Sequence, residues 1–143
     1  MNNAINALSV LLIDDDDVAL EAVQRSLRKH NVLCPVYTAC DGLEGLDILR
    51  ETHPSKKIPK PYLVLLDLNM PRMNGFEFLN ELRADPLLKE TVVFVLTTSN
   101  NDADRNKAYN ENIAGYMVKS AVGPQFQKLA LLLEHFSQAV VMP

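Results

Sequence analysis

Short apolar runs that lack polar alternation recur along the chain. There are five of them, at residues 10–13, 36–38, 63–66, 92–96 and 116–118. Runs of this length without alternation are typical of strands that helices cover on both faces of a sheet. The run at 36–38 is the weakest and is expected at an edge. Each of the other four is followed or ended by a polar residue, in order Asp14, Asp67, Thr97 and Lys119.

Apolar residues spaced three or four apart predict a helix after each of these strands. The expected helices begin near Asp16 or Asp17, Asp41, Gly75, Asp102 and Pro124. Asp41, with Glu44 three residues later, has the pattern of a capping box, and Asp85 followed by Pro86 should end the third helix. The fourth, at residues 102–112, has few apolar residues and is poorly amphipathic.

Strands that alternate with helices five times predict an α/β protein with a doubly wound parallel sheet. The chain of 143 residues fits one domain, 1–143, with a core at about 9–136. Right-handed crossovers place the carboxyl ends of the strands at one edge, where open α/β sheets bind their ligands. The polar residues that end the strands should therefore meet there.

Composition narrows the class of protein. A net charge of −4 with scattered Lys and Arg argues against a nucleic-acid partner. No apolar segment approaches the roughly 18 residues of a membrane span, so we expect no membrane contact and a cytoplasmic location. Cys34 and Cys40 lack the spacing of a metal or redox motif and are expected to be small buried residues. His30, His53 and His135 lie in helix-end or loop contexts and are expected to be surface or satisfied histidines, not phosphohistidines or ligands.

The strand ends bring together an unusual set of groups: Asp14 and Asp15, Asp67, Thr97 and Lys119. Neighbouring carboxylates repel by about 4 kcal/mol per pair at an effective dielectric near 20. A divalent cation relieves this repulsion, and a set of oxygen ligands favours Mg²⁺. An Asp carboxylate beside Mg²⁺, an ammonium and a hydroxyl has what is needed to accept a phosphoryl group.

At these residues the chain resembles a known family. The segments VLLIDDDD, LVLLDLNMPRMNGFEFL, VVFVLTTS and GYMVKS resemble those of bacterial response-regulator receiver domains, with matching separations, over roughly residues 9–136. The resemblance implies the flavodoxin-like strand order 2-1-3-4-5 with five helices. It also implies a phosphoacceptor that catalyses only its own phosphoryl transfer and dephosphorylation, and that is not otherwise an enzyme.

The resemblance assigns roles residue by residue. Asp67 is the phosphoacceptor, Asp14 and Asp15 organise Mg²⁺, and Lys119 binds the phosphoryl group. Asn69 matches the position that lends its backbone carbonyl to the metal. The remaining matches are the switch residues Thr97 and Tyr116, and the dephosphorylation-rate modulators Asn69 and Ser99.

Many receivers carry a cis proline after this lysine, whereas Ser120 follows Lys119 here. A cis bond without proline costs about 2.5–4 kcal/mol, so we expect a trans bond or a strained loop. The TTS and KS segments and the Lys/Pro loop at 53–61 resemble single-domain receivers that work with phytochrome-type histidine kinases. The expected partners are therefore a sensor histidine kinase and a downstream protein.

Other readings stay open on the sequence. A Mg²⁺-dependent phosphatase with an aspartyl nucleophile resembles this site but needs a second acid where Asn69 stands. A degenerate receiver could act as a binding module that needs no phosphorylation. The last helix carries Leu131 and Leu132 beyond its core positions, and residues 140–142 are apolar. Core packing of a longer helix and a homodimer through this face are equally compatible with that pattern.

Overall fold

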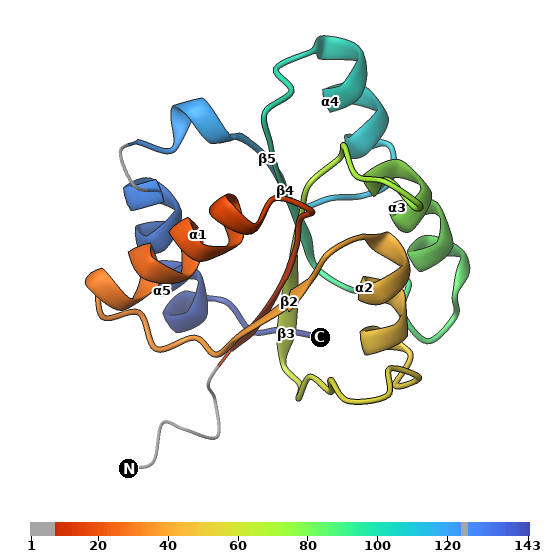
Figure 1. The fold of residues 1–143 in the computed structure, drawn as a ribbon, viewed down its shortest axis with the longest axis horizontal. Helices are drawn as coiled ribbons and strands as arrows, with labels where there is room; N and C mark the ends of the chain where they lie inside the picture. The colour runs from red at the N-terminus through yellow and green to blue at the C-terminus, as the bar shows by residue number, and fades with distance from the viewer. Residues whose placement is uncertain (1–7, 124–125) are drawn as a thin grey trace.

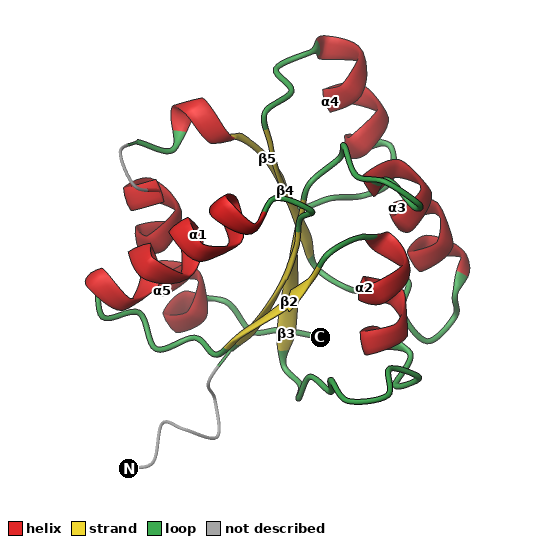
Figure 2. Cartoon of the chain, viewed as in Figure 1, coloured by secondary structure: helices red, strands yellow, loops and turns green. Residues whose placement is uncertain are grey.

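The computed structural model describes residues 8–123 and 126–143, and over them it shows a parallel sheet between two layers of helices (Figures 1 and 2). The strands are β1 (Ser9–Ile13), β2 (Val36–Ala39), β3 (Tyr62–Leu66), β4 (Val93–Thr97) and β5 (Gly115–Val118). Their spatial order is β2-β1-β3-β4-β5, and all four pairings are parallel. The expected strand order is confirmed, and β2 lies at an edge.

Five α-helices connect and follow the strands, as expected. They are α1 (Asp17–Lys29), α2 (Gly42–Leu49), α3 (Gly75–Ala84), α4 (Asp102–Tyr109) and α5 (Gln127–Ala139), with a short 3₁₀ helix η2 (Lys119–Ala121) after β5. In Figure 1, α1 and α5 cover one face of the sheet, whereas α2, α3 and α4 cover the other. Pro124, which was expected to open the last helix, lies outside the described residues.

The α4 helix ends three residues earlier than the sequence pattern predicts. Its last helical residue is Tyr109, and Asn112 adopts a left-handed backbone conformation with φ of 59°. That conformation cannot continue a right-handed helix. Asn tolerates it better than most residues, so residue 112 cannot belong to the helix, which is capped at Asn110.

The core forms on both faces of the sheet because strand side chains alternate. Leu11 and Ile13 of β1 pack with α2 and α3, while Val10 and Leu12 pack with α1 and α5. All four side chains are at most 2% exposed. A strand covered on both sides is apolar at every position, which explains the unbroken apolar runs.

Acidic side chains begin two of the helices. Asp16 is the N-cap of α1 and accepts a hydrogen bond from the N–H of Val18. Asp41 is the N-cap of α2 and accepts from the N–H of Glu44. The Glu44 carboxylate in turn accepts from the N–H of Cys40 at 2.7 Å, one residue before the cap. Each side chain satisfies a backbone donor that the helix leaves unpaired.

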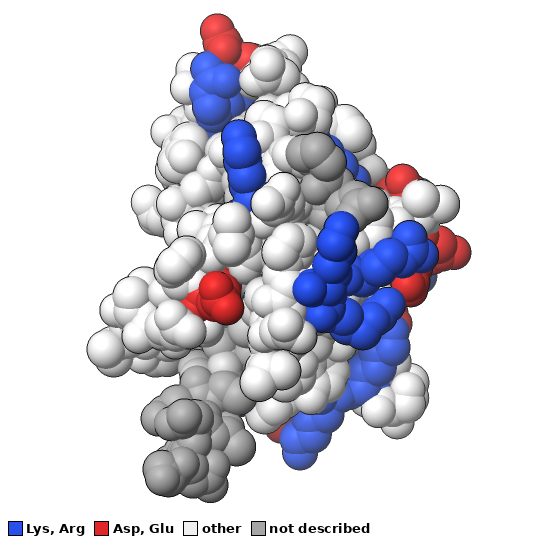
Figure 3. All heavy atoms as spheres, turned by 90° about the vertical axis from the view of Figure 1, so that its left-hand side faces the viewer, with Lys and Arg blue, Asp and Glu red and all other residues white. Residues whose placement is uncertain are grey.

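Two sequence expectations about the surface need correction. Cys34 is buried as expected, but Cys40 is exposed, because it follows the end of edge strand β2. Basic side chains are also not evenly scattered: they gather in one area of the face that α1 and α5 cover (Figure 3). The exposed basic residues of these two helices are Arg25, Arg28, Lys29 and Lys128.

The C-terminal helix packs some of its apolar side chains against the core and leaves others exposed. Leu129 and Leu133 are buried against the sheet, and Leu132 packs partly against the same core. Leu131 is 40% exposed and Val141 is 95% exposed. Core packing therefore accounts for part of the apolar surface, and a homodimer through the remainder stays a prediction. Among the described residues, no helix is long and apolar enough to cross a membrane.

Candidate functional site

Three carboxylates lie together where β1 and β3 end. Ile13 and Leu66 are partners in the parallel β1–β3 pairing, so the residues that follow them are also neighbours. Oxygen atoms of Asp14, Asp15 and Asp67 all lie within 4.8 Å of one another. Asp14 and Asp67 are buried, whereas Asp15 is exposed and opens the cluster to solvent.

The side chain of Lys119 reaches this cluster from the end of β5. Its Nζ donates to Asp14 Oδ2 at 2.7 Å and lies 3.9 Å from Asp67 Oδ2. Asp14 Oδ1 also accepts from the N–H of Asp16. The lysine side chain is 14% exposed, so its charge interacts with the two carboxylates at reduced solvent screening.

Asp67 has an unfavourable environment for its charged form. Burial raises the pKa of the Asp67 carboxyl, and the negative charge of Asp14 raises it further. The ammonium of Lys119, the Thr97 hydroxyl and the N–H of Leu68 act in the opposite direction without cancelling the rise. Burial and the neighbouring carboxylate of Asp14 therefore disfavour the charged form of Asp67, as expected of carboxylates that share a site.

This set of groups fits a hard divalent cation. Three carboxylates face one ammonium, so one added Mg²⁺ would balance the charge. Mg²⁺ takes oxygen ligands, keeps several waters and needs only one or two carboxylates from the protein. The exposed position of Asp15 leaves room for such waters. The residues present are thus compatible with the expected cofactor.

The backbone after Asp67 is held close to the strand it leaves. The N–H of Gly75 donates to the carbonyl of Leu68 at 3.0 Å. A Cβ atom at position 75 would lie 2.6 Å from the carbonyl oxygen of Asp67, so only glycine fits here. Asn69 is exposed in the loop that this contact closes.

Thr97 is the last residue of β4, whereas Tyr116 lies within the neighbouring strand β5 and pairs with Val95. Both contact Ser99. Thr97 is fully buried, and its Oγ1 accepts from the N–H of Ser99 at 3.4 Å. The Tyr116 hydroxyl donates to the carbonyl of Ser99 at 3.0 Å. The Ser99 hydroxyl donates to Asp104 Oδ2 on α4 at 2.7 Å. Ser99 therefore links β4 and β5 to the first turn of α4, a contact that the sequence did not predict.

The peptide bond after Lys119, where Ser120 replaces the proline of many receivers, does not have a strained cis geometry. Among the described residues the cis peptide bond is that between Lys60 and Pro61, so the bond between Lys119 and Ser120 is trans. Lys119 reaches the carboxylates without a cis bond.

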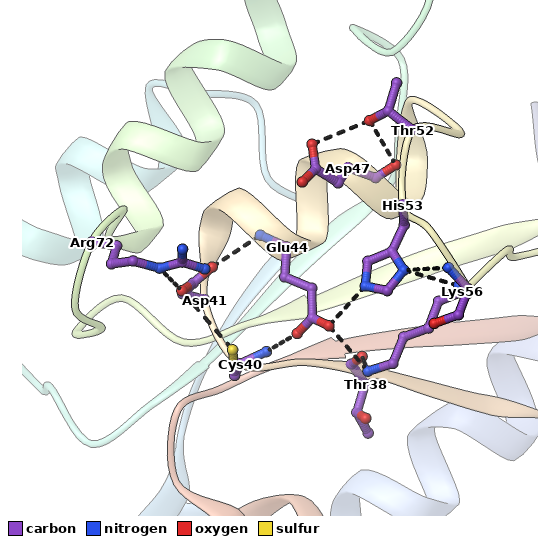
Figure 4. A network of polar contacts seen from close by, with 10 residues as sticks. Thr38, Cys40, Asp41, Glu44, Asp47, Thr52, His53, Lys56 and Arg72 are labelled. Atoms are coloured by element: carbon purple, nitrogen blue, oxygen red, sulfur yellow. Dashed lines mark hydrogen bonds and ion pairs between the residues drawn. The ribbon is translucent and has the colours of Figure 1, made fainter.

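His53 is a satisfied histidine, one of the two alternatives that the sequence favoured, but its partners were not indicated by the sequence. Its Nδ1 accepts from the N–H groups of Ser55 and Lys56, so its Nε2 carries the proton and donates to Glu44 at 3.0 Å (Figure 4). Glu44 also contacts the Lys56 ammonium at 3.2 Å. The contacts of Glu44 with His53 and Lys56 join residues nine and twelve positions apart, and no local pattern indicates them.

A cavity of about 580 Å³ lies away from the cluster of Asp14, Asp15, Asp67 and Lys119. It opens at the amino-terminal ends of β1 and β3, and its lining includes Leu8, Pro61, Phe136, Val140 and Met142. Of the described residues that line it, Lys60 is the one with a charged side chain. Volume alone therefore does not identify the site in this protein; the convergence of ionisable groups does.

The fold and the cluster together define a flavodoxin-like protein with an acidic pocket at the carboxyl ends of its strands. A family model described as the response regulator receiver domain matches residues 10–130. The chain belongs to this family and is a receiver-domain response regulator of two-component signalling.

Individual relatives cover nearly the whole chain. Response regulator Rcp1 of Synechocystis sp. is 32% identical over 135 residues, which are 94% of this chain and 92% of Rcp1. The crystal structure of the phosphorylated cyanobacterial phytochrome response regulator RcpA has a TM-score of 0.83 at 32% identity, covering 96% of this chain and 99% of RcpA. The Mn²⁺-bound form of Rcp1 has a TM-score of 0.81 at 31% identity and covers 96% and 99%.

Proposed function

We propose that this chain is a stand-alone receiver, a single domain over 1–143, that accepts a phosphoryl group on Asp67 from a histidine kinase. The observation that carries the proposal is the buried Asp67 carboxylate, which lies beside Asp14, Asp15 and the ammonium of Lys119. The phosphorylated form of RcpA and the Mn²⁺-bound form of Rcp1 support it by similarity.

In this proposal Mg²⁺ is held by Asp14, Asp15, Asp67 and the backbone carbonyl of Asn69. When bound, the cation neutralises the carboxylates and the charge of the transferring phosphoryl group. Asp15 and Asn69 are both exposed, so solvent and a phosphodonor have access to them.

The chain's own residues supply the rest of the reaction. A carboxylate oxygen of Asp67 attacks phosphorus while the bond to the donor histidine nitrogen breaks; the electron pair stays on that nitrogen. Lys119 compensates the charge of the phosphoryl oxygens, and its place between two carboxylates keeps it there beforehand. The Thr97 hydroxyl donates to a further oxygen.

The signal would be a shift between two arrangements of the loop after β4. A phosphoryl oxygen draws the Thr97 hydroxyl towards it, and Tyr116 changes its rotamer. Because Tyr116 and Ser99 share a hydrogen bond and Ser99 contacts Asp104, the change is transmitted to α4. Asn69 and Ser99 would set the rate of dephosphorylation.

The proposed partners are a histidine kinase of the phytochrome type and a downstream protein that recognises the altered α4 surface. We also propose that the chain acts in the cytoplasm and that the exposed part of the C-terminal helix face can form a homodimer. An aspartyl-nucleophile phosphatase is not favoured, because the amide of Asn69 cannot act as the second acid.

Incubation with acetyl phosphate, followed by a phosphate-binding gel, tests the proposal. Wild-type protein should give a retarded band only with Mg²⁺, and Asp67→Asn should give none. The matched control is Asp47→Asn, which changes an exposed aspartate of α2 outside the cluster and should leave the band intact. A Mg²⁺-dependent band in Asp67→Asn would refute Asp67 as the acceptor.

A further inference from the structure

The loop between β3 and α3 carries Asn69, and it rests against the N-terminus of α2. The carbonyl of Met73 accepts from the N–H of Gly42 at 3.1 Å. A Cβ atom at position 42 would lie 2.8 Å from Met73 Cγ, so the close approach depends on glycine. The loop is thus seated on the first residue of α2.

An ion pair fixes the same loop from a second direction. Arg72 Nε donates to Asp41 Oδ2 at 2.5 Å, across 31 positions of sequence (Figure 4). The Asp41 side chain is only 4% exposed, whereas that of Arg72 is 60% exposed. Arg72 also has a left-handed backbone conformation with φ of 61°, which is unfavourable for a residue with a side chain. A stable contact at this residue is therefore needed to hold the loop in shape.

Asp41 divides its two oxygens between the helix and the loop. Oδ1 accepts from the N–H of Glu44 and caps α2, while Oδ2 accepts from Arg72. Removal of the arginine would leave the cap in place. The helix and the loop can accordingly be separated by mutation.

The N-terminus of α2 is itself firmly anchored. Glu44 accepts from the N–H of Cys40, from His53 and from Lys56, and the Lys56 ammonium also donates to the carbonyl of Thr38 at 2.8 Å (Figure 4). These contacts tie α2 to the end of β2 and to the loop after α2. These hydrogen bonds and ion pairs therefore hold the segment that carries Asp41 in place.

We propose that Arg72 is a positioning residue for the cation site: its ion pair with Asp41 fixes the loop that presents the Asn69 carbonyl. The inference rests on the proposed function, in which that carbonyl is a ligand of Mg²⁺. Arg72 itself touches neither the cation nor the phosphoryl group.

The direction in which the Mg²⁺ affinity changes when Arg72 is removed distinguishes a positioning role from a purely electrostatic one. Arg72 is a cation, so loss of its charge alone would strengthen the binding of Mg²⁺. Loss of loop position would weaken it, because a ligand would no longer be held in place. A fall in Mg²⁺ affinity after removal of Arg72 therefore cannot come from its charge.

Calorimetric titration of the metal-free full chain with MgCl₂ tests the inference without reference to phosphorylation. Arg72→Ala should raise the Mg²⁺ dissociation constant roughly three- to tenfold, less than the 10–100-fold typical of residues that contact a metal ligand directly. Arg72→Lys should restore part of the affinity. Arg72→Ala should have a smaller effect in an Asp41→Asn background, in which the amide still caps α2.

Arg50→Ala is the matched control. Arg50 also forms ion pairs, with Glu81 and Asp85 of the α3 region, but at the opposite end of α2. It should leave the Mg²⁺ dissociation constant unchanged. Equal effects of Arg72→Ala and Arg50→Ala, or unchanged affinity in Arg72→Ala, would overturn the inference. Failure of the wild type to bind Mg²⁺ would instead overturn the proposed cation site.

Discussion

The helices α2 and α4 have the same length, eight residues each, but differ sharply in how they are held. The α2 helix buries five residues: Gly42, Gly45, Leu46, Ile48 and Leu49. The α4 helix buries only Ala108. Both follow strands whose ends lie near the carboxylate cluster, so the site has one tightly packed neighbour and one loosely packed neighbour.

The polar contacts also hold α2 more firmly than α4. At the N-terminus of α2, the polar contacts come from the end of β2, from the loop after α2 and from the loop after β3. At α4, the first turn is held through Ser99 and Asp104. The other end is fixed by Arg83, which donates to the carbonyls of Glu111 and Asn112. A helix fixed at its ends with little buried surface can repack at low cost, whereas α2 is suited to hold the acceptor loop still.

Core truncation should show the largest difference between the helices. Leu46→Ala in α2 should lower the free energy of unfolding by about 2–5 kcal/mol, because the removed side chain is 2% exposed and leaves a cavity. Tyr109→Ala in α4, where the side chain is 47% exposed, should cost less than about 1 kcal/mol. Urea unfolding at pH 7 measures both. Equal losses would contradict the proposed difference in packing.

The sequence predicted the strands and the strand-end residues because each depends on local pattern. An apolar run that ends at Asp67 or Lys119 locates the residue at a sheet edge without knowledge of any contact. The Arg72–Asp41 and His53–Glu44 pairs could not be predicted, because each joins separate segments and depends on how helix and loop pack. The exposure of Cys40 likewise depends on β2 being an edge strand.

Acid should weaken the anchoring of α2, because it protonates the Glu44 carboxylate that holds the N-terminus of the helix. Burial alone would raise the pKa of Glu44, but hydrogen bonds from Cys40, His53 and Lys56 lower it from 4.5 to about 2. A depressed carboxyl pKa stabilises the fold above the unfolded value of 4.5, and this contribution is lost as pH falls towards about 2. Glu44→Gln should cost about 1 kcal/mol at pH 7, since solvent near the surface screens the charge.

Urea unfolding of wild type and Glu44→Gln at a series of pH values measures this contribution. The difference between the two proteins should be constant above pH 5 and should shrink steadily below pH 4.5. Glu134→Gln on α5 is a control for general charge effects. A difference that stays constant down to pH 3 would show that the Glu44 charge does not anchor the helix.

The smallest change in stability, and the most direct test of the switch, concerns Ser99. Ser99→Ala removes the hydrogen bond to Asp104 and should cost about 1 kcal/mol or less. Amide exchange in the first turn of α4 should nevertheless become several-fold faster, because little buried surface remains to hold it. Exchange in α2 should not change. Ser137→Ala, which removes a hydroxyl bond to Glu134 within α5, is the matched control and should leave α4 as it is.

Phosphorylation of the wild type should then alter exchange across residues 102–119 while α2 keeps its protection. In Ser99→Ala the same treatment should produce a smaller change, since one link from β4 and β5 to α4 is already absent. Identical exchange in resting and phosphorylated wild-type protein across this segment would rule out α4 as the moving element. The difference between the two helices would then concern stability alone.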